Sequence, residues 1–299
     1  MRERFDVSEP YRVEHIDVRW ARIDGVAFHA TVWRPATDRP ARSPWATLLD
    51  VHGGAWTYCD RSSDSYVNRR LAACGTVVIA IDFRLAPENP YPAACIDVNA
   101  ATRWLKREVA SLGGTPERLG AIGGSSGGHL VLLSALRPFD TVYASAAGHE
   151  TIEPWSPGGG PDASLAYVVA LWPITDVPEC HERAQRNLGF HESAPERVKG
   201  NEGFFETSAA REVEASPIHV VREGRAQQLP PVLLQQPDRD TQTTTPMQEA
   251  FAEAYRAAGG TIDFVNLPGM AHAPASEPGA DADHCIEIMK RFIATQLPA

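Results

Sequence analysis

The stretch AIGGSSGGHL, residues 121–130, decides the fold of this 299-residue chain. Residues 123–127 within it fit the pattern G-x-S-x-G, in which a serine sits on a sharp turn between a strand and a helix. Apolar residues at 119–122 predict the strand, and apolar residues at helical spacing over 128–136 predict the helix. Such a turn strains the serine backbone and projects its hydroxyl beside a helix N-terminus, so Ser125 is a candidate nucleophile.

The rest of the chain alternates strand and helix patterns around this turn. Apolar runs predict buried strands at 46–51, 76–81, 166–171, 231–234 and 262–267. Helical spacing predicts helices at 65–74, 92–112, 245–258 and 282–296. Two further strands, 13–20 and 26–33, flank the hairpin signal Asp24-Gly25. We therefore expect one domain over residues 1–299, with a mostly parallel α/β sheet, flanking helices and a site at the carboxyl ends of the strands.

One stretch, at about residues 176–225, interrupts this alternation. It is polar, rich in arginine and glutamate, and only weakly helical. An excursion of this length between two core strands is more than a connecting loop. We interpret it as a cap inserted over the site, and a surface insertion without a role is the alternative.

A second glycine-rich segment, HGGAW at residues 52–56, follows a predicted buried strand. Its adjacent glycines, Gly53 and Gly54, let the backbone turn N–H groups toward a substrate oxygen. Together with the N–H of Ser126, these groups would stabilise the oxyanion of a tetrahedral intermediate.

A serine hydroxyl is a weak nucleophile until a base takes its proton. Of the ten histidines, His272 lies in a turn just after the last predicted strand, level with Ser125 at the carboxyl edge of the sheet. The imidazole in turn needs a carboxylate to orient it. Two aspartates follow another strand end, and we prefer Asp240 because it sits deeper in its loop, with Asp238 as the alternative.

Other residues in these segments receive mainly structural interpretations. His129 and His284 fall within predicted helices and are expected to be structural. Thr245 is expected to cap the helix that follows it, and Gln248 to complete a capping box. Trp56 is expected either to line the substrate pocket or to belong to the core.

Taken together, these segments resemble the hormone-sensitive-lipase-like and related carboxylesterase group of the α/β-hydrolase superfamily. Three blocks carry the resemblance: HGGAW (52–56), DFRLAPENPYPAACIDV (82–98) and GGSSGGHL (123–130). The chain order Ser125, Asp240, His272 is also that of α/β-hydrolases. The resemblance implies a serine hydrolase that cleaves small-molecule carboxylic esters through an acyl-enzyme, without a metal or cofactor. It would also allow a homodimer formed along an edge strand.

The glycine-rich loop departs from this family pattern. Ala55 and Trp56 stand where lipase-like members carry a third glycine, and the loop is also similar to that of kynurenine formamidases. Gly54 is the preferred oxyanion donor in either pattern, whereas Gly53 and Ala55 compete for second place. An arylformamidase is therefore the alternative function. A non-catalytic receptor on the same fold is a third, although such receptors typically lose a member of the triad.

The composition of the chain argues against some classes of binding partner. The chain carries 28 Lys and Arg against 38 Asp and Glu, a net charge of -10, and no basic stripe, which argues against nucleic acid and anionic membranes. The longest apolar run, 165–172, is too short to span a bilayer. The N-terminal residues lack the apolar core of a signal peptide, and five scattered cysteines form no C-x-x-C pair. These features predict a cytoplasmic protein with reduced thiols.

Overall fold

The computed structural model of the chain describes residues 5–36 and 45–297. An eight-stranded sheet runs through it in the order β1-β2-β4-β3-β5-β6-β7-β8. The strands are β1 (Val13–Ile23), β2 (Val26–Pro35), β3 (Ala46–Val51), β4 (Thr76–Ile81), β5 (Gly120–Gly124), β6 (Tyr167–Leu171), β7 (Val232–Pro237) and β8 (Ile262–Leu267). The β1–β2 and β2–β4 pairs are antiparallel and the other pairs are parallel, which confirms the mostly parallel sheet predicted from the sequence.

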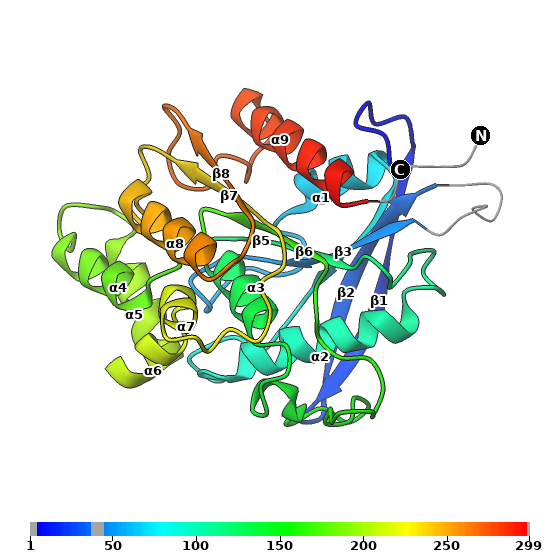
Figure 1. Ribbon diagram of the computed structural model, residues 1–299, viewed down its shortest axis with the longest axis horizontal. Coiled ribbons are helices and arrows are strands. Elements are labelled where there is room, and N and C mark those ends of the chain that lie inside the picture. Colours follow the sequence, from blue (N-terminus) through cyan, green and yellow to red (C-terminus); the bar gives the residue numbers. More distant parts are fainter. Residues whose placement is uncertain (1–4, 37–44, 298–299) are drawn as a thin grey trace.

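Helices cover both faces of this sheet (Figure 1). They are α1 (Ser65–Ala73), α2 (Ala93–Glu108), α3 (Ser126–Leu136), α4 (Val177–Arg186), α5 (Ala194–Phe205), α6 (Ala209–Glu214), α7 (Pro217–Arg222), α8 (Thr245–Ala257) and α9 (Ala280–Gln296). α1 and α9 pack in one apolar cluster on one face, and α2, α3 and α8 pack in a larger cluster on the other. Within the described ranges, no helix is long and apolar enough to cross a membrane.

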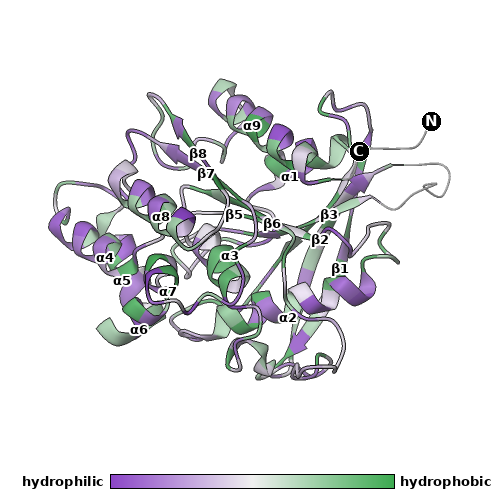
Figure 2. Cartoon of the chain, viewed as in Figure 1, coloured by the Kyte–Doolittle hydropathy of each residue, from purple (hydrophilic) through white to green (hydrophobic). Residues whose placement is uncertain are grey.

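Alternation along the strands explains the two clusters. Leu48 and Val78 pack in the cluster with α1 and α9, whereas their sequence neighbours Leu49 and Ile79 pack in the cluster with α2 and α3. Successive side chains of a strand point to opposite faces, so strands that are apolar throughout bury both faces of the sheet. Every residue of α3 is buried, and Figure 2 shows its ribbon as largely hydrophobic, whereas α4 and α9 carry hydrophilic turns.

The excursion between β6 and β7 folds into helices α4–α7. α4, α5 and α6 lie together at one end of the molecule (Figure 1). α7 differs, because its buried residues Ile218 and Val220 pack it against α3 and α8 in the main helical layer. The part of the excursion that lies apart from the sheet is therefore shorter than the stretch 176–225 predicted from the sequence.

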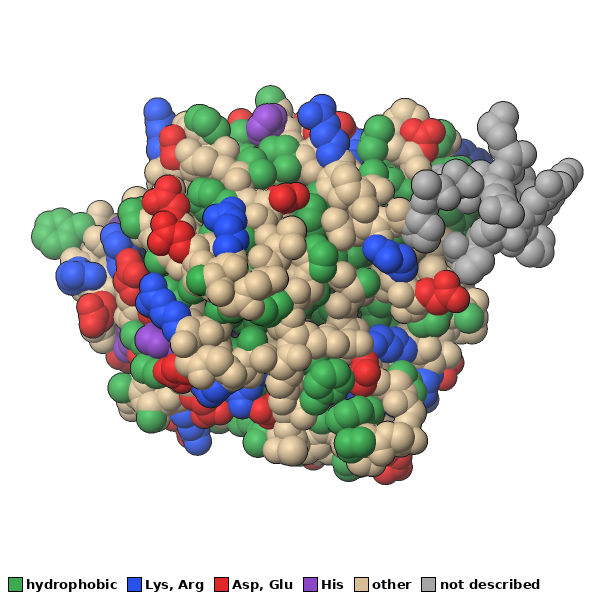
Figure 3. All heavy atoms as spheres, viewed as in Figure 1, with side chains coloured by type: hydrophobic (Ala, Val, Ile, Leu, Met, Phe, Trp, Pro, Cys, Tyr) green, Lys and Arg blue, Asp and Glu red, His purple; other side chains and the backbone are tan. Residues whose placement is uncertain are grey.

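The exposed surface carries both signs of charge. Figure 3 shows Lys and Arg side chains interspersed with Asp and Glu side chains over the visible face. The net charge of -10 is therefore not gathered in one acidic patch on that face.

Candidate active site

Ser125 lies on the turn between β5 and α3, in a backbone conformation with φ 54° and ψ -120°. Its N–H donates to the carbonyl of Leu171 at 2.9 Å, which ties the turn to β6. A Cβ added at Gly123 would lie 2.6 Å from the backbone of Gly127, and one added at Gly127 would lie 2.0 Å from the carbonyl oxygen of Val51. Only glycine fits at these two positions, because strand and helix backbones touch there.

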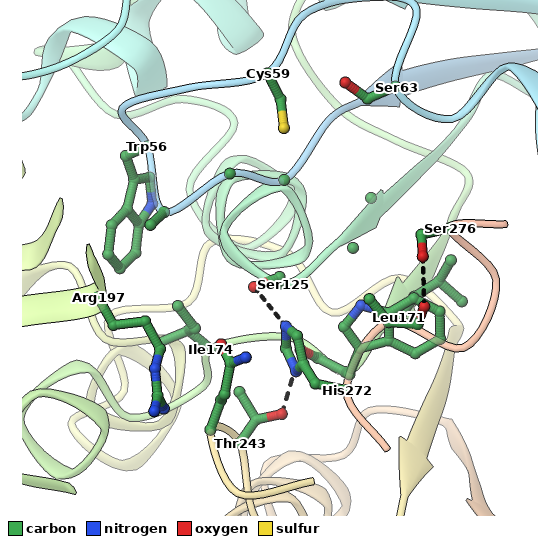
Figure 4. A pocket seen from close by; sticks show the side chains of 18 of the residues that line it. Trp56, Cys59, Ser63, Ser125, Leu171, Ile174, Arg197, Thr243, His272 and Ser276 are labelled. Carbon is green, nitrogen blue, oxygen red and sulfur yellow. Dashed lines mark hydrogen bonds between the residues drawn. The ribbon is translucent and has the colours of Figure 1, made fainter. Parts of the chain in front are cut away.

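Ser125, His272 and Asp240 form one chain of hydrogen bonds. The distance from His272 Nε2 to Ser125 Oγ is 3.1 Å, and that from His272 Nδ1 to Asp240 Oδ2 is 2.7 Å. Figure 4 shows the Ser125 hydroxyl and the His272 ring pointing toward one another. With its proton on Nδ1, His272 donates to Asp240 and accepts from Ser125. Three residues from the ends of β5, β7 and β8 thus meet at the carboxyl edge of the sheet.

Asp240 is held as a carboxylate by several donors. Burial alone would raise the pKa of Asp240, but hydrogen bonds from His272, Thr243 and the backbone N–H of Gln242 hold that pKa below its ordinary value. The Thr243 hydroxyl and the Gln242 N–H each donate at 2.7 Å. These fixed donors stabilise the negative charge in a site where Asp240 is only 6% exposed.

Asp238, the alternative acid, takes a different place. It is exposed, and its Oδ1 accepts the N–H of Gly269 at 2.7 Å. That bond fastens the loop after β7 to the turn that precedes His272. The structure thus brings Asp240, and not Asp238, to the imidazole.

The loop HGGAW turns its backbone into the left-handed region at three successive residues. The φ angles are 103° at Gly54, 47° at Ala55 and 62° at Trp56. Within the described chain, the N–H groups of Gly53, Gly54, Ala55 and Ser126 have no hydrogen-bond acceptor. The loop and the first turn of α3 therefore offer a set of unused donors beside Ser125.

Two side chains fix the start of this loop. His52 Nδ1 lies 2.8 Å from the carbonyl oxygen of Gly53, and the His52 ring stacks on Phe83 with centroids 4.3 Å apart. Burial lowers the pKa of His52, which favours a neutral ring. His52 therefore shapes the loop and does not contact Ser125.

Trp56 both lines the cavity in front of Ser125 and belongs to the core. Its side chain is 3% exposed, and its Nε1 donates to His129 Nδ1 at 3.2 Å. The Trp56 backbone N–H donates to the Ser126 hydroxyl at 3.3 Å, which ties the loop to α3. Trp56 thus lines this cavity and also packs in the core, and its contact with a substrate stays a prediction.

The two histidines expected to be structural lie away from the reacting groups. His129 is fully buried, its Nε2 lies 2.8 Å from the carbonyl oxygen of Ala215, and burial lowers its pKa to about 4. His284 is exposed on α9. Neither ring contacts Ser125.

A cavity of about 340 Å³ opens in front of Ser125. His272, the HGGAW loop and the ends of β5 and β6 form its inner wall, and residues of α4 and α5 form its outer wall. α6 and α7 contribute no lining residue. The volume suits a small ligand, and two helices of the excursion enclose it.

The cavity also contains polar side chains that lie away from Ser125 and that were not predicted from the sequence. Asp50 and Asp64 line it on the side of α1. Burial and the nearby charge of Asp64 raise the pKa of Asp50 well above its usual range, and Asn68 Nδ2 donates to Asp50 at 2.6 Å. Burial raises the pKa of Asp64 to about 6. A carboxyl inside the apolar strand 46–51 was the one signal available in the sequence.

Comparison with known families and structures places the chain in a class. A family model described as "alpha/beta hydrolase fold" matches residues 48–276, which is most of the chain. The protein belongs to this alpha/beta-hydrolase family, as the motifs predicted.

Named relatives support this membership. Esterase LipQ of Mycobacterium tuberculosis is 28% identical over 244 residues, which cover 81% of this chain and 53% of LipQ. An acetyl-hydrolase of Streptomyces hygroscopicus is 30% identical over 265 residues, covering 86% of this chain and 78% of that protein. The chain spans about half the length of LipQ and of the similarly matched esterase LipC of the same organism.

Solved structures show the same fold. An esterase of Pseudomonas putida superposes with a TM-score of 0.74 at 23% identity, covering 98% of this chain and 85% of that chain. Esterase 2 of Thermogutta terrifontis in its native form superposes with a TM-score of 0.69 at 20% identity, covering 98% and 95%.

Proposed function

We propose that this protein is a serine hydrolase that cleaves carboxylic esters of small molecules. The observation that carries the proposal is the hydrogen-bonded chain Ser125–His272–Asp240, which faces a cavity beside unused backbone N–H groups. The esterase names of its relatives support the same reaction class.

In the proposed reaction, His272 Nε2 takes the proton of Ser125 as the hydroxyl oxygen attacks the ester carbonyl. Negative charge then develops on the former carbonyl oxygen. We assign its stabilisation to the N–H groups of Gly54 and Ser126 together with that of Gly53 or Ala55. Preorganised donors act strongly here, because they need no rearrangement as the charge appears.

The proposed cycle closes by three proton transfers. Protonated His272 gives its proton to the leaving alcohol, which leaves an acyl group on Ser125. His272 then takes a proton from the water molecule whose oxygen attacks the acyl carbonyl, and it returns that proton to Ser125 Oγ as the bond between Ser125 and the acyl group breaks and the acid leaves. Asp240 keeps the imidazole in the required tautomer and stabilises its cation, and the donors around Asp240 keep that residue charged.

We propose a single domain in which the excursion serves as a cap. α4 and α5 supply the outer wall of the cavity, so the cap limits the size and shape of the substrate. Closure of the cavity also lowers the local dielectric constant, which strengthens the interactions of the oxyanion with its donors.

Replacement of the nucleophile tests the proposal. We expect the wild-type protein to hydrolyse p-nitrophenyl acetate and to be labelled by a fluorophosphonate probe. Ser125→Ala should lower kcat by about 10⁵- to 10⁶-fold and abolish labelling. Ser63→Ala is the matched control, since Ser63 lines the same cavity and lies apart from His272 (Figure 4). Retention of esterase activity by Ser125→Ala would disprove the assignment.

An arylformamide is the second candidate substrate, and the HGGAW loop at 52–56 favours it. The same groups would cleave a formamide, with His272 protonating the leaving amine. A comparison of kcat/KM for p-nitrophenyl acetate and N-formylkynurenine separates the two. A higher value for N-formylkynurenine, abolished by Ser125→Ala, would replace the ester assignment with the amide one.

A further inference from the structure

The cap wall of the cavity carries polar side chains that lack partners. Arg197 and Asn201 both line the cavity and lie four residues apart on α5, which puts them on the same face of the helix. Figure 4 draws the Arg197 side chain among those that line the cavity, with Ile174 between it and His272. Neither residue takes part in the Ser125–His272–Asp240 chain.

Arg197 is a cation without a counter-ion in the described part of the chain. Its side chain makes one hydrogen bond there, from Nε to the carbonyl oxygen of Ser193 at 3.3 Å, and its Nη2 is buried without an acceptor. A guanidinium withdrawn from water is costly unless an acceptor or an anion compensates it.

The other arginines of α4, α5 and α6 are paired with carboxylates. Each has a carboxylate within 4 Å: Arg183 with Glu179, Arg186 with Glu182, and Arg211 with Glu206. Among the described arginines of α4, α5 and α6, Arg197 is therefore the one without a carboxylate within 4 Å, and it is the one that lines the cavity.

Asn201 provides a neutral donor beside this cation. The residue is 3% exposed, and its side-chain amide makes no hydrogen bond to any described residue, with Oδ1 buried and unpaired. A carboxylate at this wall would accept from the Arg197 guanidinium and the Asn201 amide nitrogen together. The planar guanidinium fits the two oxygens of a carboxylate better than any other side chain does.

The charges around the cavity direct an anion to this wall. Asp64, whose pKa of about 6 leaves it charged at neutral pH, lines the opposite side near α1 and repels a negative group, whereas the buried Asp50 beside it keeps its proton. Glu196 also lines the cavity on α5, but its side chain is exposed to solvent, where its charge is screened. An anionic substrate would therefore lie with its charge at α5 and its ester group at Ser125.

We propose that Arg197 and Asn201 bind a carboxylate that the substrate carries in addition to its ester group. The preferred substrates are then monoesters of dicarboxylic acids or esters of hydroxy acids. This inference rests on the proposed ester hydrolysis. Under it, α5 selects the substrate but takes no part in the bond-breaking steps.

The test compares an anionic ester with a neutral one of similar length. We would measure kcat/KM for p-nitrophenyl hydrogen glutarate and for p-nitrophenyl pentanoate with the wild type, Arg197→Met and Lys199→Met. Lys199 is the matched control, because it is an exposed cation on α5 outside the cavity lining. Arg197→Met should lower kcat/KM for the glutarate ester by about 10- to 100-fold, mainly through KM, and that for the pentanoate ester by less than about threefold.

Two further arms complete this test. Acetoxyacetate carries its carboxylate on the alcohol part, so the ester whose hydrolysis depends more on Arg197 identifies which part binds at α5. Arg197→Lys should recover part of the preference, since it restores the charge without the planar fork. Equal losses on anionic and neutral esters, or no loss on either anionic ester, would overturn the inference.

A binding measurement separates this inference from the proposed hydrolysis. Monomethyl glutarate should bind the Ser125→Ala protein in calorimetry, and addition of Arg197→Met should weaken that binding at least about tenfold. Loss of hydrolysis in Ser125→Ala with unchanged binding in the double variant refutes the inference alone. Absence of any ester hydrolysis in the wild type refutes the proposed function, and the binding result still decides the role of Arg197.

Discussion

The indole ring of Trp56 stacks on the phenyl ring of Phe204, with ring centroids 5.1 Å apart and ring planes 4° apart. Trp56 belongs to the glycine-rich loop beside Ser125, whereas Phe204 belongs to the last turn of α5. Phe205 meets the same indole edge-on, with centroids 5.4 Å apart. One aromatic cluster therefore joins the backbone donors of the loop to the cap.

Removal of Phe204 should loosen this junction. Phe204→Ala is expected to lower the free energy of unfolding by about 3–5 kcal/mol and to raise KM for p-nitrophenyl esters, because the ring is fully buried against Trp56. Urea denaturation and steady-state kinetics measure the two effects. Phe190→Ala is the control, since Phe190 is 90% exposed on the same excursion and should change stability by less than about 0.5 kcal/mol.

A methyl group at Gly54 should disable the loop. An added Cβ would lie 2.2 Å from the carbonyl oxygen of Tyr58, and φ at Gly54 is 103°. Gly54→Ala is therefore expected to lower kcat by about 10²- to 10³-fold, the usual cost of a misplaced oxyanion donor. Ala55→Gly is the opposite case, because glycine adopts the φ of 47° more readily, and its activity should stay within about threefold of wild type. Wild-type kcat in Gly54→Ala would exclude the loop from oxyanion binding.

Substitution of the two aspartates that follow β7 should affect kcat to very different extents. Asp240→Asn is expected to lower kcat by about 10⁴-fold, because an amide favours the wrong imidazole tautomer and provides no charge. Asp238→Asn keeps an acceptor for the Gly269 N–H and should cost less than about tenfold. Single-turnover measurements with a p-nitrophenyl ester report the step directly. A larger loss in Asp238→Asn than in Asp240→Asn would reverse the assignment.

The acidic pair in the cavity should make stability depend on pH. Because burial and repulsion raise the pKa of Asp50, the folded protein keeps a proton that the unfolded chain releases above about pH 4. The contribution of the Asp50 proton to the free energy of unfolding is therefore fully present below about pH 4. It is lost as the pH rises through the pKa that Asp50 has in the folded protein. Asp50→Asn should raise the free energy of unfolding by about 1–3 kcal/mol at pH 8 and by almost nothing near pH 4. Urea melts across this range measure the difference.

Asp60 offers a control of opposite sign for that series. Hydrogen bonds from the Ser62 side chain and backbone lower the pKa of Asp60, which is exposed. Asp60→Asn should therefore not stabilise the protein at pH 8. Equal stabilisation by Asp50→Asn at both pH values would show that packing, and not proton release, is responsible.

Local patterns predicted the elements that carry the reacting groups. The strand and helix around Ser125 follow from apolar spacing and from glycines that permit close contact. His272 and Asp240 could be chosen because each follows a predicted strand, and parallel strands present their carboxyl ends on one edge. The ends of helices followed less closely from these patterns, since the helix predicted over 92–112 spans Ala93–Glu108.

Tertiary contacts decided what the sequence could not predict. Thr245 does not cap α8, whose N-cap residue is Thr244. Gln248 instead donates to the carbonyl oxygen of Pro173 at 2.5 Å and accepts from Thr175 at 3.0 Å, so the core competes successfully for its amide. The unpaired state of Arg197 likewise depends on which carboxylates fold near it, and neither propensity nor periodicity contains that information.

The hydrogen-bonded residues Ser125, His272 and Asp240 lie far apart in the sequence, which makes their contact a measure of folding. Ser125 and His272 are 147 residues apart, and they meet only when β5 and β8 stand in the same sheet. Pairing between strands so far apart in the sequence is slow, because the entropic cost of closing large loops precedes the contacts that offset it. Covalent titration of Ser125 would therefore count native molecules, and the return of reactivity during refolding would report completion of the whole sheet.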